Sequence, residues 1–431
     1  MLAVLRSSWA LLLGILLLMI GNGLQGTLLG VRGNIEGFDP ALLSYVISAY
    51  FIGFLGGSKM APGLIRRVGH VRVFAAMASM ISAAFILYAA APNLIAWAFL
   101  RLMVGFCFSC VYVVAESWLN DASDNEHRGQ ALSLYVIVQM LGIVTAQGIL
   151  SLGDPAGYGL FVLISVLVSI SFAPILLSVS PAPVYQATKG MTLRELFNVS
   201  PLGFVGSFAI GAAFSALFGM SSVYGTEVGF TLDEIAIFVA SIYVGGMILQ
   251  YPIGWMSDRM DRRLLIVGVT ATACAACLGA IAVGDSFYIG LGMAFLIGGM
   301  VNPLYSLLIA HANDYLDHED MAAAAAGLVF VGGVGAIGGP VIVGQMMSIL
   351  GAWAFYLYVL ITMGSVSLYG IWRMTRRAAT PVDETASYAA VSPRSSYVVV
   401  DMAQEYAVEQ IVAEEEMAPD QGEIGTIVTK T

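Results

Sequence analysis

The chain has 431 residues, of which 11% are charged and 59% hydrophobic, whereas soluble proteins carry about 25% charged residues. The formal net charge is −10, but residues 381–431 hold ten acidic side chains, so residues 1–380, with 16 basic and 18 acidic side chains, are nearly neutral. This composition excludes a water-soluble enzyme. It also excludes a nucleic-acid-binding protein, because such a protein needs an excess of basic residues that this sequence lacks.

Twelve apolar stretches are long enough to cross a bilayer, which takes about 20 apolar residues. The first follows a single basic residue, Arg6, and is too long for the core of a signal peptide, so we expect it to be retained. The stretches predict an all-α polytopic membrane protein with twelve transmembrane helices. In chain order they are 9–30, 41–60, 73–91, 94–119, 131–152, 158–179, 202–224, 235–256, 264–283, 287–310, 321–350 and 352–372.

The basic residues between these stretches lie almost entirely on one side of the predicted membrane. An even number of spans puts both ends of the chain on the same side, and that side has 14 of the 18 Lys and Arg residues. The opposite side has only Arg32. The positive-inside rule therefore predicts that both termini are cytoplasmic.

The chain is organised as two similar halves. Residues 1–180 and 201–377 each hold six stretches and a basic loop between the second and third, and residues 181–200 form a cytoplasmic linker. Two such halves are the layout of a rocking transporter with a site at the midplane. Residues 378–431 are acidic and show no apolar periodicity, so we expect a disordered cytoplasmic tail.

Several motifs resemble those of the major facilitator superfamily. The segment Gly254–Arg263 resembles the superfamily's basic loop signature, with Asp261 in place of a glycine. Arg101, four residues before Gly105, resembles the arginine motif of the fourth helix. Gly335, Gly339 and Pro340 resemble the glycine-proline helix-packing motif, here in the eleventh stretch rather than the fifth.

A second group of residues is similar to the YcaD-like branch of bacterial transporters. The group consists of Ala115–Leu119, Arg128 with Gly129, and Tyr135. The resemblance implies a monomeric secondary transporter of the bacterial cytoplasmic membrane that moves a small molecule, needs no cofactor or metal, and leaves proton coupling open. It also implies that certain deep polar residues line the cavity, each of which can equally serve as an interhelical hydrogen bond. They are Asn22, Gln25, Arg101, Tyr135, Gln139, Tyr243, Gln250, Asn302 and Tyr305.

Charged residues at the cytoplasmic ends of the stretches predict a gate that forms ion pairs in one state and breaks them in the other. We expect Glu116 to pair with Arg66, Arg67 or Arg128; the alternative is a solvated carboxylate at the end of a helix. In the second half the same role falls to Asp258, Arg259, Arg262 and Arg263, unless that loop serves only topology.

Arg101 is the one basic residue well inside an apolar stretch, about 12 Å into a core of about 30 Å. An unpaired cation there costs at least ~2.5–3.5 kcal/mol. It either faces the cavity, or fastens neighbouring helices through their carbonyl groups. No acidic residue lies near the centre of any stretch, which predicts a neutral or anionic organic solute moved by alternating access.

Two other function classes stay open alongside a solute transporter. One is a membrane sensor or binding protein built on a transporter scaffold, and the other is a multidrug efflux pump for hydrophobic compounds. The matched basic loops favour transport, since a static receptor needs no gates. An enzyme is not expected, because no stretch offers a nucleophile with a base or a set of metal ligands.

Overall fold

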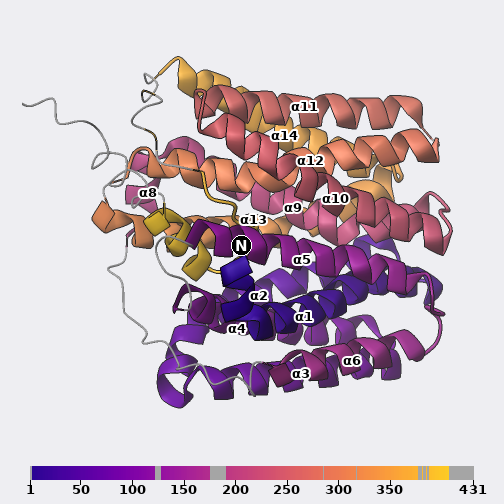
Figure 1. The fold of residues 1–431 in the computed structure, drawn as a ribbon. Helices are drawn as coiled ribbons and strands as arrows, with labels where there is room; N and C mark the ends of the chain where they lie inside the picture. The colour runs from indigo at the N-terminus through magenta and orange to yellow at the C-terminus, as the bar shows by residue number, and fades with distance from the viewer. Residues whose placement is uncertain are drawn as a thin grey trace, which may run out of the picture.

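The computed structural model describes residues 2–121, 128–174, 191–284, 286–316, 318–376, 381, 385 and 388–406, and all regular structure within them is helical. Part of the predicted linker (181–190) and most of the predicted tail (378–380, 382–384, 386–387 and 407–431) lie outside these residues, as does Arg377. The helices run roughly parallel to one another (Figure 1).

Helices α1 to α6 form the first half and α8 to α14 the second. The bounds in the first half are α1 Leu2–Ile35, α2 Pro40–Val68, α3 His70–Ala90, α4 Leu94–Asp121, α5 Arg128–Leu150 and α6 Gly159–Ser171. In the second half they are α8 Leu193–Val199, α9 Pro201–Glu227, α10 Leu232–Ser257, α11 Arg262–Val283, α12 Phe287–Asn313, α13 His318–Leu350 and α14 Ala354–Met374.

Eleven of the described helices are long and apolar enough to cross a membrane, and α6 is a shorter apolar helix at the place of the sixth stretch. The predicted fold class is confirmed. The helices form because no backbone group in a bilayer core can bond to water, so each must be satisfied within its own segment. Polar residues mark helix starts outside that core: Asp39 caps α2, and Thr231 forms a capping box with Glu234 at the start of α10.

The two halves repeat the same packing. In the first half α1 packs on α5 and α6, α4 on α2 and α3, and α3 on α6. In the second half α9 packs on α13 and α14, α12 on α10 and α11, and α11 on α14, which is the same set of pairs. Between the halves, α2 packs on α13 and α5 on α10. Figure 1 shows the halves as two helix layers, the second above the first.

The glycine-proline residues lie where α13 packs on α9. A Cβ at Gly335 would overlap the backbone oxygen of Phe208, and one at Gly339 would overlap that of Ala212. Pro340 lies inside α13 directly after Gly339. These glycines therefore let two helix backbones approach more closely than any other residue would allow.

The two ends of the bundle differ. We call the end with α8 and the loops α2–α3 and α10–α11 the basic end, because Arg66, Arg67, Arg259, Arg262 and Arg263 lie there. At the other end the halves touch directly. A Cβ at Gly30 of α1 would overlap Ser222 of α9, and one at Gly344 of α13 would overlap Ser44 of α2.

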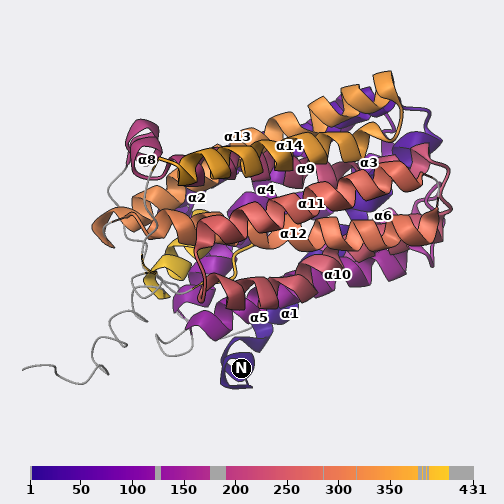
Figure 2. The same cartoon turned by 90° about the horizontal axis from the view of Figure 1, so that it is seen from above.

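At the basic end residues 388–406, here named the C-terminal segment, lie between the halves (Figures 1 and 2). Residues 397–406 of the segment are helical. The predicted disordered tail is wrong for this segment. Val399, Met402 and Ala403 share one helical face, and all three are buried against the bundle, which supplies the apolar contacts that the sequence of the tail alone does not reveal.

Candidate functional site

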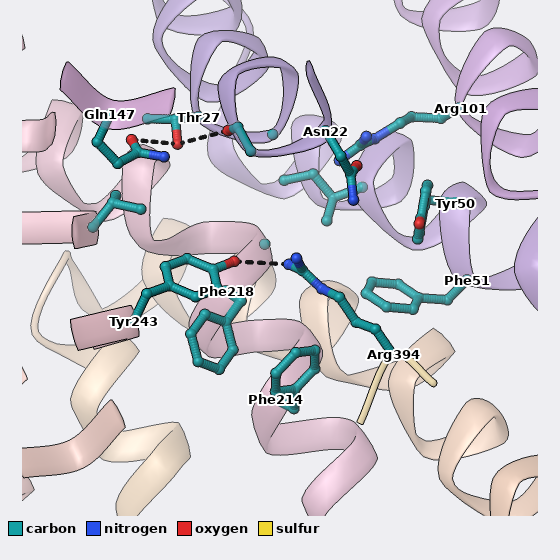
Figure 3. A pocket seen from close by; sticks show the side chains of 15 residues that line it. Asn22, Thr27, Tyr50, Phe51, Arg101, Gln147, Phe214, Phe218, Tyr243 and Arg394 are labelled. Carbon is teal, nitrogen blue, oxygen red and sulfur yellow. Dashed lines mark hydrogen bonds between the residues drawn. The ribbon is translucent and has the colours of Figure 1, made fainter. Parts of the chain in front are cut away.

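A small space lies between the two halves, near the middle of the helices. Its volume is about 40 Å³, which is room for about three water molecules. Figure 3 shows the labelled side chains around it. It is lined by Asn22, Gly23, Gly26 and Thr27 of α1, Ile47, Tyr50 and Phe51 of α2, Arg101 of α4, Gln147 of α5, Phe214, Phe218 and Gly219 of α9, Val239 and Tyr243 of α10, and Arg394 of the C-terminal segment.

Arg101 lines this space and contacts a neighbouring helix, through a side-chain amide rather than through the helix carbonyl groups that the sequence suggested. Its side chain is only 6% exposed and donates through Nη1 to Oε1 of Gln25, which ties α4 to α1. The guanidinium lies 5.0 Å from the centre of the Tyr50 ring, and its Nε has no hydrogen-bond partner among the described residues. Arg101 thus fastens helices and still presents an unsatisfied donor beside the cavity.

The second arginine of the cavity comes from the C-terminal segment. Arg394 donates through Nη2 to the hydroxyl oxygen of Tyr243 at 2.7 Å, and its guanidinium lies 5.4 Å from the centre of the Phe214 ring (Figure 3). Among the described residues neither Arg101 nor Arg394 has a carboxylate partner. A buried positive charge, Arg101, and a partly buried one, Arg394, therefore face one space without an acid between them among the described residues.

The remaining polar wall of the cavity comes from α1 and α5. Thr27 donates to Oε1 of Gln147 at 2.9 Å, and Asn22 donates to the hydroxyl of Tyr112 at 3.5 Å (Figure 3 shows the first bond). Sequence reasoning missed Thr27 and Gln147. The sequence could have indicated both as cavity residues, because each is a polar side chain inside an apolar stretch, the feature by which Asn22 was predicted.

The structure divides the predicted cavity residues into groups. Asn22, Arg101 and Tyr243 line the cavity, and Gln25 holds Arg101. Tyr305 lines an adjoining space that it shares with Tyr50 and Arg394. The other four lie elsewhere in the bundle: Tyr135 donates to Glu116 at 2.8 Å, Asn302 donates to Gln250 at 3.2 Å, and Gln139 is buried with no partner for Nε2 among the described residues.

Glu116 lies in a different environment from the one we expected. It is fully buried, and its carboxylate accepts hydrogen bonds from the Tyr135 hydroxyl at 2.8 Å and the Ser396 backbone N–H at 2.9 Å. Arg128 pairs with Glu405 of the C-terminal segment at 3.1 Å. The expected pairing of Glu116 with an arginine is wrong in this structure, because the segment lies between them. The solvated alternative is wrong as well.

The charged loop of the second half makes ion pairs within that half. Arg262 pairs with Asp314 at the end of α12 and lies 3.8 Å from Asp258. Arg263 pairs with Asp261 at 2.8 Å, and although burial would raise the pKa of Asp261, the bonds from Arg263 hold it below its usual range. Asp258 also accepts the backbone N–H of Tyr388 in the C-terminal segment at 2.8 Å.

The remaining predicted gate residues lie at helix ends. Arg259 lies 4.4 Å from the centre of the Trp255 ring, and Arg66 and Arg67 are exposed at the end of α2. In this state the basic end is therefore held through the C-terminal segment, and the two charged loops do not meet each other in any described contact.

Comparison with known proteins identifies the family to which this architecture belongs. The family model of the Major Facilitator Superfamily matches residues 11–242 and 204–398, the second range reaching into the C-terminal segment. The uncharacterized MFS-type transporter YfkF of Bacillus subtilis is 26% identical over 368 residues, which is 82% of this chain and 93% of YfkF. The uncharacterized MFS-type transporter YcaD of Salmonella typhi is 24% identical over 79% of this chain and 89% of YcaD, which bears out the branch.

The fold is also that of solved transporters. The crystal structure of the nucleoside transporter NupG aligns with a TM-score of 0.69 at 15% sequence identity, over 86% of this chain and 98% of NupG. This likeness concerns the course of the helices in both halves.

Proposed function

Because the chain belongs to the major facilitator superfamily, and is a transporter rather than an enzyme, we propose that it moves a small neutral or anionic organic solute across the cytoplasmic membrane by alternating access. The solute site is the space between the halves that Asn22, Arg101 and Tyr243 line. The observation that carries this proposal is the charge of that space, which holds guanidinium groups and no carboxylate among its described lining residues.

The argument for solute charge is one of desolvation. An organic cation that leaves water for a buried site needs an anionic partner there, because the loss of hydration is otherwise uncompensated. An anion gains such a partner in Arg101, whose Nε is buried without an acceptor. A neutral solute with hydroxyl or carbonyl groups finds donors and acceptors in Asn22 and Tyr243 as well.

The orientation follows from charge. We propose that the basic end faces the cytoplasm, with both termini on that side, because the positive-inside rule applies to its arginines. The direct contacts of α1 with α9 and of α2 with α13 at the other end then close the outer side, so the structure corresponds to a state whose opening is toward the cytoplasm. The protein acts as a monomer in the lipid bilayer, which is its second partner. Uptake measured with and without a pH gradient tests whether transport is coupled to protons.

A second candidate function has one specific observation in its favour. Phe51, Phe54 and Phe214 line an apolar space that adjoins the cavity, and such a wall suits a hydrophobic drug-like compound. An efflux pump would therefore bind apolar compounds here, and Arg101 would then serve helix packing alone.

The test is uptake into proteoliposomes of purified protein, with and without a pH gradient, for compounds matched in size but cationic, neutral or anionic. Arg101→Gln removes the charge from the cavity, so we expect it to abolish anion uptake, whereas Arg72→Gln changes an exposed arginine at the basic end and should leave uptake unchanged. Saturable uptake of a quaternary ammonium compound would contradict the proposal. Uptake of apolar compounds that survives Arg101→Gln would favour efflux.

A further inference from the structure

The C-terminal segment fills the opening between the halves at the basic end. Val391, Val399 and Val400 are fully buried, and the neighbouring Ser396 is buried as well. Apolar side chains gain free energy by leaving water only where the bundle offers a site that buries them. The burial therefore indicates a specific docked position for residues 388–406.

Hydrogen bonds fix this position from the second half. The backbone N–H of Tyr388 donates to Asp258 at 2.8 Å. Val391 and Ser306 of α12 exchange two hydrogen bonds of 2.9 Å, one through each backbone group of Val391. Backbone groups of Tyr388 and Val391 are thus satisfied by the side chains of Asp258, which follows α10, and Ser306 of α12, as the backbone of a bound peptide would be.

The first half holds the other part of the segment. Glu116 of α4 accepts the backbone N–H of Ser396, and Arg128 at the start of α5 pairs with Glu405. A Cβ at Gly129 would overlap the Tyr406 ring, and one at Gly254 of α10 would overlap the Tyr388 ring, so a glycine at each helix makes room for one end of the segment. The segment therefore bridges both halves.

Between these attachments the segment sends Arg394 into the solute cavity. The guanidinium lies against Phe214 and Tyr243, and about 40 Å³ remains empty around it. That volume holds about three waters and no organic solute. A solute and the docked Arg394 therefore exclude each other.

We propose that the C-terminal segment is a built-in plug of the solute cavity, which binds between the separated halves and must leave before a solute enters from the basic end. The ligand of this site is thus a peptide of the chain itself, bound through its backbone at Glu116, Asp258 and Ser306 and through Arg394 in the cavity. This inference goes beyond the proposed function, and it does not depend on which solute is carried.

A route for release lies beside the docked segment. A space of about 480 Å³ between α5 and α10 is lined by Gly129, Gly254 and Trp255, together with Tyr388 and Tyr406 of the segment. This volume gives the two tyrosines room to move out of their glycine contacts.

The test measures access to the cavity in purified full-length protein, so that it is independent of membrane orientation and of the solute. A cysteine at Asn22 reports access through its rate of reaction with a hydrophilic maleimide, after subtraction of the labelling of the parent chain, three of whose four cysteines are buried. Val400→Asp places a carboxylate at a fully buried position of the docked segment and so disfavours docking. Val428→Asp makes the same change outside the segment and is the matched control.

We expect the reporter at Asn22 to react slowly in the otherwise unchanged chain and in Val428→Asp, and at least tenfold faster in Val400→Asp. A synthetic peptide of residues 388–406, added to Val400→Asp protein, should restore slow labelling. Equal rates in Val400→Asp and Val428→Asp would overturn the proposal. If Val400→Asp does not yield folded protein, Ser396→Pro tests the same point, because it removes the N–H that Glu116 accepts, and an unchanged rate there would equally overturn the proposal.

Discussion

Removal of the Glu116 carboxylate should release the C-terminal segment by an amount that the structure allows us to work out. Glu116 is fully buried and accepts the N–H of Ser396 at 2.9 Å. In Glu116→Ala this N–H loses its acceptor only while the segment is docked, because water satisfies it after release. A buried donor left without a partner costs about 1–3 kcal/mol, which is about a 5- to 150-fold change in the docking equilibrium. The Tyr135 hydroxyl loses its acceptor in both states and so contributes little to the difference.

The measurement uses Val400→Cys, at a position that is 0% exposed when the segment is docked. Its maleimide labelling rate is proportional to the released fraction, as long as the docked state dominates and exchange is fast. We expect Glu116→Ala to raise this rate about 5- to 150-fold, and Glu116→Gln to raise it less, because the amide keeps an acceptor oxygen. A rate in Glu116→Ala that equals the parent rate, with Arg72→Cys labelled equally in both backgrounds, would refute the assigned contact.

Two further predictions concern pH and helix packing. Burial, reinforced by Glu405 and opposed by Arg128, raises the pKa of Asp401 to about 6, so docking takes up a proton and should tighten as the pH falls through about 6. Asp401→Asn should remove most of this dependence in the Val400→Cys labelling assay. Glu116 and Asp258 are the other carboxylates of the bundle that face the segment. A pH profile that Asp401→Asn leaves unchanged would assign the effect to those two. Gly335→Val places side-chain atoms on the backbone of α9 and should lower the melting temperature of the purified protein, by an overpacking cost of about 1–3 kcal/mol. Gly338→Val is its control, since the nearest atom to a Cβ there is 3.9 Å away, and equal melting temperatures for the two variants would contradict the packing argument.

The helices were predictable from the sequence because each is an apolar run bounded by polar or glycine-containing loops. The stretch 287–310 corresponds to α12 at Phe287–Asn313, and 94–119 to α4 at Leu94–Asp121. These two helices extend beyond the apolar run at the basic end, and α1, which ends at Ile35 rather than at residue 30, does so at the other end, since hydrophobicity marks the bilayer core and not the end of a helix. The repeat was equally visible, because it rests on matched loops.

The C-terminal segment could not be predicted in the same way, because its site is made by residues of α4, α10 and α12 that are far apart in sequence. The tail is acidic overall, and that average concealed a short pattern: Val399, Met402, Ala403 and Tyr406 recur at the spacing of one helical face. This pattern was the available signal for a docked helix. Nothing comparable marked Arg394, whose place in the cavity follows only from the docking of its neighbours.

The same misjudgement explains the error at Glu116. Its place at the cytoplasmic end of an apolar stretch put the carboxylate near the surface of the membrane, where an arginine or water was its expected partner. The carboxylate does lie toward that end of α4, but the segment covers it and supplies a backbone N–H in place of a charge. A carboxylate that binds a peptide N–H rather than a guanidinium is released by movement of the tail alone, without any change in the helices.

Docking of the segment and closure of the basic end must oppose each other. The segment contacts Glu116 and Arg128 in one half and Asp258 and Ser306 in the other, so it occupies the volume that the halves need in order to meet at that end. By thermodynamic linkage, whatever favours closure of the basic end expels the segment, and whatever holds the segment in place keeps that end from closing. A docked segment therefore stops the transport cycle in one state as well as filling the solute cavity, and two independent blocks follow from a single binding event.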